Sequence, residues 1–365
     1  MKKLSFLMVI LIFALASCKK NNNVSPSNPN SGNPTQQQPM TLRGADLSYL
    51  PEIEQAGTIF YDSTGAATDP LTIFKNNGCN TVRLRLWYQP ATVHSSFPEV
   101  LAFANTIHQA GMKVWLDIQY SDTWTDQGNQ AKPASWANLS TQVLEDSVYQ
   151  YTKRVVAAIQ PEYVQIGNEI NDGFLWNNGK VNNTSTFIAL LDKGIQAAKT
   201  ADGSTQVIIH FAGYKSAFWF YRLLQSNNVN YDIIGISYYP WWHGKDLNVM
   251  EDSLSRLSST FNKKIVIAET AYPFTLGWND LTNNVVGESS QLISQYPATP
   301  DGQKNYLLAL RNVLSKDTNN LGFCYWEPDW VAFKGPQATN GSTWENLALF
   351  DFNNKALPGM AVFNK

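Results

Sequence analysis

Residues 163–168 read YVQIGN, residues 185–200 read STFIALLDKGIQAAKT, and residues 206–211 read QVIIHF. The first and third stretches are short and rich in Val and Ile, which is typical of parallel strands that are covered on both faces. The middle stretch repeats its apolar residues at the spacing of an amphipathic helix. A strand, a helix and a second strand in this order predict a βαβ unit with two parallel strands.

The same alternation runs through the chain from Thr41 onward. Repeated strand–helix units favour a closed (β/α)₈ TIM barrel, formed as one catalytic domain by residues 41–365. An open doubly wound sheet would ordinarily carry a Gly-rich phosphate loop after its first strand, whereas this chain reads GADLSYLPEIE there. Gly78 and Gly111 follow two helical stretches, where a left-handed cap is needed. The expected strands are Leu42–Asp46, Thr81–Trp87, Lys113–Tyr120, Tyr163–Asn168, Gln206–Phe211, Ile233–Tyr239, Lys264–Glu269 and Gly322–Trp326, with helices over Asn138–Ile159, Ser185–Thr200, Asp246–Thr260 and Gly302–Leu314 among those between them.

The composition argues against a polyanion as ligand. The 27 Lys and Arg residues are balanced by 29 Asp and Glu residues, so the net charge of -2 offers no general attraction for nucleic acid. Charged residues make up only 15% of the chain, whereas aromatic residues reach 13% and include 12 Trp. This surplus of indole rings suits binding to neutral ring-shaped ligands such as sugars, although a large aromatic core remains the alternative for any one Trp.

A basic pair and an apolar stretch, Leu4–Ala16, begin the chain and are too short to span a bilayer. The stretch ends in LASC, which resembles the lipobox of bacterial lipoproteins. We therefore expect a signal peptide over residues 1–17, lipidation of Cys18, and membrane attachment through this anchor only. Cleavage near Ser17 by an ordinary signal peptidase stays open. Residues 18–40 are a polar Asn/Ser/Pro/Gln tract, which predicts a flexible tether.

The other two cysteines, Cys79 and Cys324, lie beside or within expected strands and far apart in the sequence. We expect two buried thiols here rather than a disulfide. No cysteine spacing of the metal-binding CxxC type is present in the sequence, and no metal ligand is predicted.

Polar and aromatic side chains follow the ends of the expected strands, where the active site of such a barrel lies. Two glutamates, Glu169 and Glu269, come directly after the fourth and seventh strands, which face each other across an eight-stranded ring. A carboxylate there is costly to bury without a partner. Glycoside hydrolysis uses such a pair, one as acid and one as anion, about 5–5.5 Å apart in retaining enzymes. An ion pair with an arginine of a neighbouring strand is the alternative for either one alone.

Other strand-end residues have plausible supporting roles. Asn168 is placed to hold a 2-hydroxyl of the substrate, an interaction that strengthens in the transition state. A guanidinium beneath the nucleophile would keep it ionised, but the period-two spacing of Arg83 and Arg85 leaves the choice between them open. Likewise, either Tyr238 or the next tyrosine could donate to the nucleophile. His210 is expected to be a satisfied barrel histidine rather than a catalyst.

Nine segments carry a resemblance to a known family, in this order: GADLSYLPEIEQAGTIFYD, TVRLRLWYQP, AGMKVWLDIQYSDTWTD, KPASW, YVQIGNE, IGISYYPWWHG, IVIAETAYPFT, YPATPDGQ and GFCYWEPDW. From about Leu42 to Phe350 the chain resembles the arabinogalactan endo-β-1,4-galactanases of glycoside hydrolase family 53. The Asn-Glu pair and the later glutamate are shared by many barrel hydrolases, whereas the YSDxW, YYPxWHG and ETAYP blocks are narrower.

The resemblance implies an endo-acting retaining hydrolase of β-1,4-galactan in type I arabinogalactan of pectin, with galactooligosaccharides as products. It implies that Glu169 is the acid/base and Glu269 the nucleophile. It implies sugar contacts for Asp46, Arg83, Trp87, Asp122, Trp124, Asn168, His243 and Trp326, to which we add Tyr238 on the argument above. Family members commonly read DFHYSDxWADP where this chain has Gln119 in place of the histidine, so a titrating role at that position is in doubt.

No cofactor is required by the two-carboxylate mechanism. Some relatives bind a structural calcium through the loops after the seventh and eighth strands. Asp280, Asn283, Asn284 and Glu288 lie in the first of these loops, but without a recognisable ligand spacing, so calcium binding stays open.

Three functions are compatible with the sequence. They are the galactanase, a related barrel hydrolase acting on mannan or β-glucan, and a glycan-binding lipoprotein without catalysis. The two glutamates argue against the third. We expect a monomer in the cell envelope, held as an outer-membrane lipoprotein and displayed at the cell surface, because the polysaccharide is too large to cross the outer membrane intact.

Overall fold

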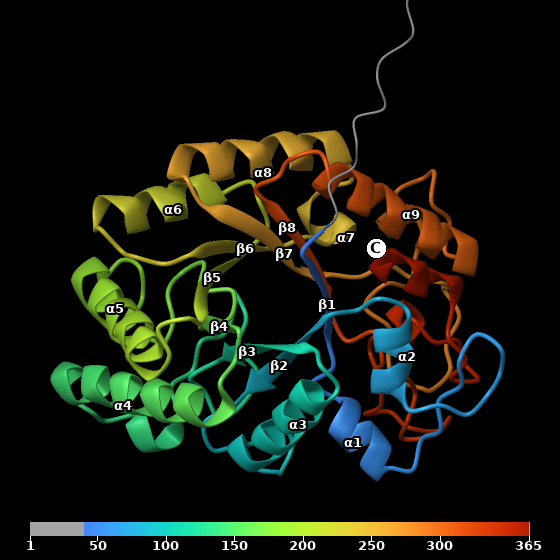
Figure 1. Cartoon of the computed structure of the whole chain (residues 1–365), viewed down its shortest axis with the longest axis horizontal. Helices are drawn as coiled ribbons and strands as arrows, with labels where there is room; N and C mark the ends of the chain where they lie inside the picture. Colours follow the sequence, from blue (N-terminus) through green and yellow to red (C-terminus); the bar gives the residue numbers. More distant parts are fainter. Residues whose placement is uncertain (1–39, 365) are drawn as a thin grey trace, which may run out of the picture. The chain divides into compact units, whose positions relative to one another are not determined.

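A closed barrel of eight parallel strands forms the centre of the chain in the computed structural model, which describes residues 40–364 (Figure 1). Each strand pairs in parallel with the next, and the last pairs with the first. The predicted (β/α)₈ fold is therefore confirmed. The strands are β1 (Leu42–Asp46), β2 (Thr81–Leu86), β3 (Lys113–Ile118), β4 (Tyr163–Ile166), β5 (Gln206–Ala212), β6 (Ile233–Ser237), β7 (Lys264–Thr270) and β8 (Asn320–Tyr325).

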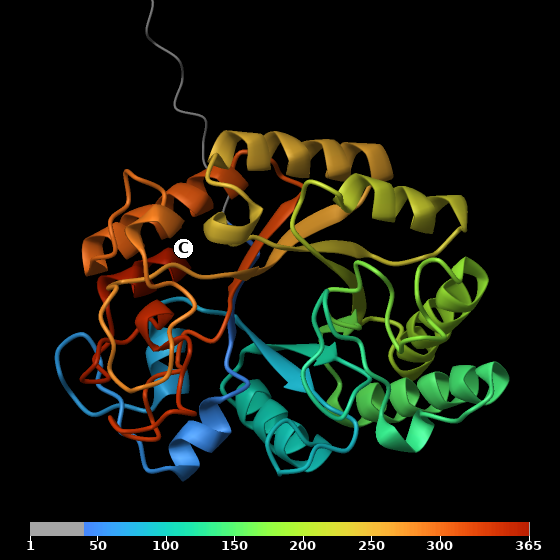
Figure 2. The same ribbon diagram turned by 180° about the vertical axis from the view of Figure 1, so that it is seen from behind.

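Helices surround the barrel on its outer side (Figures 1 and 2). Their apolar faces cover the outward side chains of the strands, and this layer holds most of the hydrophobic core. The helices are α1 (Leu50–Gln55), α2 (Pro70–Asn76), α3 (Phe97–Gln109), α4 (Thr141–Ile159), α5 (Thr184–Ala201), α6 (Ala217–Ser226), α7 (Pro240–His243), α8 (Leu247–Phe261) and α9 (Pro300–Leu314), with short 3-10 helices η1 (Ala134–Trp136), η2 (Ser289–Gln291), η3 (Glu345–Leu347) and η4 (Pro358–Phe363).

The inside of the barrel is layered, and the layering places the polar residues near one end. Trp115, Tyr163 and Ile208 belong to a second, separate apolar cluster that includes residues from seven strands. Because side chains alternate along a strand, the residues two positions later share this inward face. In β3, β4 and β5 these are Asp117, Gln165 and His210, all fully buried. Apolar side chains therefore fill the inside of the barrel toward one end, and polar side chains fill it toward the carboxyl ends of the strands.

Closure of the ring depends on a glycine. Gly322 on β8 has a φ of +140°, and a Cβ added to it would lie 1.7 Å from the carbonyl oxygen of Leu42 on β1. Only glycine can bring the two strands this close. The predicted caps Gly78 and Gly111 also have positive φ, 96° and 73°, as a left-handed helix end requires.

The predicted elements differ from the observed ones mainly at the strand ends. Five of the expected strands run one or two residues too far at the carboxyl end, as with Asn168 after β4 and Tyr239 after β6. Gly167 has a φ of +77°, which ends β4 and turns the chain into the pocket. Cys79 and Cys324 are free and buried, as expected. Cys18 and the predicted signal peptide and tether lie outside the described residues, save for Met40.

None of the helices within residues 40–364 is sufficiently long and apolar to cross a bilayer.

Candidate active site

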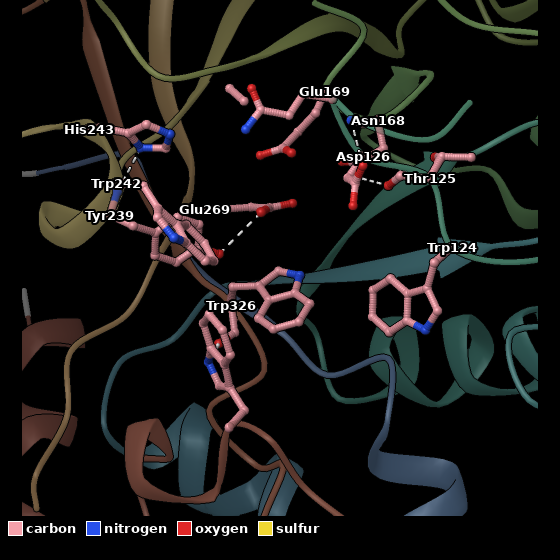
Figure 3. A pocket seen from close by; sticks show the side chains of 14 residues that line it. Trp124, Thr125, Asp126, Asn168, Glu169, Tyr239, Trp242, His243, Glu269 and Trp326 are labelled. Carbon is pink, nitrogen blue, oxygen red and sulfur yellow. Dashed lines mark hydrogen bonds between the residues drawn. The ribbon is translucent and has the colours of Figure 1, made fainter. Parts of the chain in front are cut away.

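A pocket of about 680 Å³ opens at the carboxyl ends of the strands, where a barrel of this kind places its active site (Figure 3). Both glutamates predicted from the sequence line it, and Figure 3 shows their carboxyl groups projecting into the same space. The lining residues are Trp124, Thr125, Asp126, Gln127, Gly128, Asn168, Glu169, Ala212, Tyr239, Trp242, His243, Glu269, Trp326 and Trp344.

Glu269 reaches the pocket through irregularities in β7. The pairing register of β7 shifts against both β6 and β8 close to this residue, so that Glu269 lies opposite Ser237. Such bulges re-aim side chains near functional sites. The Glu269 carboxylate receives two donors: the Arg83 guanidinium lies 2.9 Å from Oε1, and the Tyr239 hydroxyl donates to Oε2 over 3.1 Å. Both contacts favour the ionised form of Glu269.

Arg83 is itself held rigidly below the pocket. Its Nη1 contacts Asp46 at 2.7 Å as well as Glu269, and its Nη2 contacts Asp117 at 3.2 Å. Its Nη2 also donates to Asn168 Oδ1 over 2.9 Å. The guanidinium is 1% exposed, so these carboxylates are what allow the charge to stay buried. Of the two candidates, Arg83 and not Arg85 supports Glu269.

Glu169 lies in a tight turn just beyond β4. Its φ is +47°, which is uncommon for a residue with a side chain and is found where the surrounding structure imposes it. The Ser237 hydroxyl donates to Oε1 of Glu169 over 2.5 Å. No cation lies within ion-pair distance of Glu169 among residues 40–364, so the carboxyl differs from Glu269 in having a neutral partner.

Burial raises the pKa of both carboxyls. For Glu269, the Arg83 guanidinium is the largest opposing influence, while the charge of Glu169 raises its pKa further. For Glu169, burial is the largest influence on the pKa. The hydrogen bond from Ser237 lowers this pKa, and the charge of Asp126 raises it. Because each negative charge disfavours the other, the two carboxyls share one proton over part of the pH range. Burial raises the pKa of Glu269 to about 8, and of the two carboxyls only Glu269 has a guanidinium in contact, which opposes that rise.

Tryptophans form the walls of the pocket. Trp326 packs edge-on against Trp344 with ring centroids 4.5 Å apart and lies 5.8 Å from Trp124. Trp242, 57% exposed, stands at the rim. Arg85 holds Trp124 in place, because its guanidinium lies 3.8 Å from the centre of that ring and pairs with Glu327 at 2.9 Å. Flat apolar faces of this kind are where a sugar ring can stack.

Most of the predicted site residues come together. Trp124, Asn168, His243 and Trp326 line the pocket beside the two glutamates, and Asp46 and Arg83 lie directly beneath it. His243 accepts from the Tyr239 backbone amide over 3.0 Å, and burial lowers its pKa to about 4, so it is neutral.

Besides Asp46 and Arg83 beneath it, three further predicted residues do not line the pocket. The Tyr238 hydroxyl donates to the Gly244 carbonyl, so of the two tyrosines left open by the sequence it is Tyr239 that contacts Glu269. The Asp122 carboxylate accepts from the backbone amides of Gln89 and Ala134 and so ties loops together. Trp87 is buried, and its indole donates to Gln119. Each of these side chains is occupied by the scaffold that supports the pocket.

Sequence reasoning missed Ser237, Asp126 and Trp344. Ser237 ends an apolar strand, and its place beside Glu169 depends on the barrel register rather than on a motif. Trp344 comes from the long loop after β8, which carried no signal for its approach to the pocket. Asp126 lies in the loop after β3, two residues beyond the YSDxW block, and this position was the only available hint.

In the loops after β7 and β8, the acidic side chains Asp280 and Glu345 bond to backbone amides. The Asp280 carboxylate accepts from the backbone amides of Thr282 and Ser342, and Glu345 Oε1 accepts from that of Asn279. These acids therefore join the two loops directly. In the part of the chain that the structure describes, no group of three or more His, Cys, Asp and Glu side chains is arranged to hold a metal ion.

The sequence that forms this barrel and its pocket matches a known protein family. The family model described as glycosyl hydrolase family 53 matches residues 42–363. The chain belongs to this family. Family membership thus agrees with the resemblance seen in the sequence and covers nearly all of the described residues.

Two relatives of this family-53 hydrolase carry similar descriptions. The arabinogalactan endo-beta-1,4-galactanase of Cellvibrio japonicus is 37% identical over 339 residues, which cover 88% of this chain and 89% of the relative. The endo-beta-1,4-galactanase of Bacillus subtilis is 31% identical over 374 residues, covering 88% and 85%.

A solved structure supports the same placement. The GH53 catalytic domain of Ignisphaera aggregans superposes on this family-53 hydrolase with a TM-score of 0.86 at 36% identity, covering 91% of this chain and 98% of that domain.

Proposed function

We propose that this chain is a retaining endo-β-1,4-galactanase in which Glu269 is the nucleophile and Glu169 the acid/base. The observation that carries the proposal is the unequal support of two carboxyls in one pocket. Glu269 is held by a guanidinium and a phenol, whereas Glu169 is held by a neutral serine hydroxyl. An anion and a neutral acid side by side are what glycoside hydrolysis with retention requires.

In the first step, a Glu269 oxygen attacks the anomeric carbon while Glu169 transfers its proton to the departing glycosidic oxygen. The C–O bond to the leaving chain breaks, and an ester between the sugar and Glu269 forms. Arg83 and Tyr239 hold the attacking carboxylate, and Asn168 is positioned beside Glu169 for the sugar 2-hydroxyl.

In the second step, the now ionised Glu169 removes a proton from water, and the resulting hydroxide displaces Glu269 from the anomeric carbon. Two inversions give net retention. The residues of the chain supply the acid, the base and the nucleophile, so we expect no cofactor.

The substrate assignment rests on the relatives and on the character of the pocket. Two of the most similar relatives are named as endo-β-1,4-galactanases. The pocket is open, and four indoles line it beside the carboxyls, which suits a polysaccharide bound along its length. Galactose, with its axial 4-hydroxyl, keeps an apolar face that can stack on Trp326.

Reducing-sugar release from potato galactan tests this function, with mannan, xylan and carboxymethylcellulose assayed alongside. We expect short oligosaccharides to appear early and from galactan alone. Release from another polymer would keep the two-glutamate chemistry and remove the galactan assignment. No release from any of the four, by a folded sample, would favour a glycan-binding protein without catalysis.

We further propose that the enzyme is a monomeric lipoprotein of the outer membrane, displayed at the cell surface. The LASC sequence at residues 15–18 supports acylation of Cys18, and the size of the substrate supports a location outside the cell.

A further inference from the structure

Ser237 and His210 form a buried hydrogen-bonded pair behind the acid/base. Both are 0% exposed. The His210 Nε2 lies 2.8 Å from Ser237 Oγ, and Ser237 Oγ lies 2.5 Å from Oε1 of Glu169. Neither residue lines the pocket, and the steps above assign no role to either. The pair nevertheless decides which hydrogen bonds the acid can make.

The proton on His210 decides the direction of this chain of hydrogen bonds. If Nε2 carries the proton, it donates to Ser237 Oγ, and the serine hydroxyl must then donate to Oε1 of Glu169. The acid proton of Glu169 is left on Oε2. If Nδ1 carries the proton instead, Nε2 accepts from the serine, and Oε1 must hold the acid proton to donate to Ser237. The two tautomers of His210 therefore place the acid proton on different oxygens.

The surroundings of Nδ1 favour its unprotonated form. The side-chain amide of Gln165 lies 3.1 Å from Nδ1, and its orientation is set because its oxygen accepts from Arg83 Nε and its nitrogen donates to Asp117. The backbone amide of Glu169 also points at Nδ1 over 3.4 Å. Two donors thus face Nδ1. One acceptor, Asn168 Oδ1, lies 2.9 Å away, but it also lies within hydrogen-bond distance of two donors, Arg83 Nη2 at 2.9 Å and Gln165 Nε2 at 3.1 Å, which match its two lone pairs.

His210 also stays neutral, as this arrangement needs. Burial lowers the pKa of His210 well below its ordinary value, and Arg83 and His243 lower it further. Its charge therefore does not change during the reaction, and only the position of its proton matters.

We propose that His210, in the tautomer protonated on Nε2, acts through Ser237 to hold the acid proton of Glu169 on Oε2, away from Oε1. These two are positioning residues for the proton transfer to the leaving oxygen. This inference rests on the proposed role of Glu169 as the acid.

Leaving-group dependence tests the inference. A phenyl glycoside of β-1,4-galactobiose needs a proton on its leaving oxygen, whereas the 2,4-dinitrophenyl glycoside departs without one. For Ser237→Ala we expect kcat/KM to fall roughly 10- to 100-fold on the phenyl glycoside, a part of what general acid catalysis contributes, and to stay near wild type on the dinitrophenyl glycoside. His210→Gln, which can restore an N–H donor to Ser237, should recover much of the loss that His210→Leu causes.

Ser258→Ala is the matched control, because Ser258 is 1% exposed and its hydroxyl donates to a backbone carbonyl at the end of α8, outside the residues that line the pocket. It should leave both substrates unchanged. Equal losses on the two glycosides in Ser237→Ala would show a merely structural role and overturn the inference. Failure of the wild-type enzyme on both glycosides would instead refute the proposed function.

A second measurement does not depend on the variants being active. The tautomer of His210 in the wild-type enzyme can be read from two-bond ¹H–¹⁵N correlations, with its signals identified by their loss in His210→Gln. Protonation on Nε2 supports the inference, and protonation on Nδ1 overturns it.

Discussion

The neighbouring tyrosines 238 and 239 offer a test of the site in which the same chemical change has opposite consequences. Tyr239→Phe removes the hydroxyl that donates to Oε2 of Glu269 over 3.1 Å. A hydrogen bond to a charged group contributes about 1.5–3 kcal/mol. If that contribution is made to the attacking carboxylate, kcat/KM on galactan should fall roughly 10- to 150-fold, since about 1.4 kcal/mol corresponds to a factor of ten.

Tyr238→Phe is the control. The Tyr238 hydroxyl donates to the carbonyl of Gly244, a neutral group, over 2.9 Å, and the ring is fully buried. We expect this variant to lose about 0.5–1.5 kcal/mol of stability and to keep nearly full kcat/KM. Initial rates on galactan and thermal melting curves of both variants give the answer. Full activity in Tyr239→Phe, or a large loss in Tyr238→Phe, would refute the assignment of the nucleophile's neighbours.

Four further outcomes are expected. Arg83→Met should raise the pKa of Glu269 further, because an opposite charge is removed. The acidic limb of the kcat/KM–pH profile should then move to higher pH by roughly one to three pH units. If the limb stays in place in a folded variant, the ion pair is contradicted. Asp329→Ala should raise the melting temperature, since neither oxygen of this buried carboxyl has a partner within residues 40–364, which costs about 1–3 kcal/mol. Burial raises the pKa of Asp329 in the folded protein, so the wild type loses stability as the pH rises through that pKa. The rise in melting temperature caused by Asp329→Ala should therefore be larger at alkaline than at acid pH. A rise that does not depend on pH would count against this cause. Cys18→Ala should abolish incorporation of radiolabelled palmitate in cells, and persistent labelling would place the lipid elsewhere. Dialysis against EDTA should change neither the melting temperature nor the activity, and a drop in the melting temperature would indicate calcium in the loops after β7 and β8.

The barrel could be predicted from the sequence because its determinants are local. The apolar runs of β5 and β7 and the amphipathic spacing of α5 each reflect burial on a known number of faces. Glu169 and Glu269 could also be found, since a carboxylate that directly follows a buried apolar strand is costly to keep there without a chemical role or a charged partner. Active sites of such barrels lie at the carboxyl ends of the strands, which predicts that the two glutamates lie together.

What could not be predicted depends on register and on backbone turns. How the chain leaves β6 decides which of Tyr238 and Tyr239 contacts Glu269. The period-two spacing of Arg83 and Arg85 predicts that both side chains lie on one face of the strand, but it does not predict that they bind different partners. Arg83 turns to Glu269 and Arg85 to Glu327. The partnership of Ser237 with Glu169 spans 68 residues and arises only when the barrel closes. No single-sequence pattern encodes such contacts.

Covalent trapping tests the central claim, the identity of the nucleophile, most directly. A 2-deoxy-2-fluoro glycoside of β-1,4-galactobiose with a dinitrophenyl leaving group would slow the second step and leave the sugar bound to the enzyme. We predict that peptide mass spectrometry finds the added mass on Glu269, the carboxylate in contact with Arg83 and Tyr239. A label on Glu169, or the absence of any label together with an inverted product, would contradict this assignment.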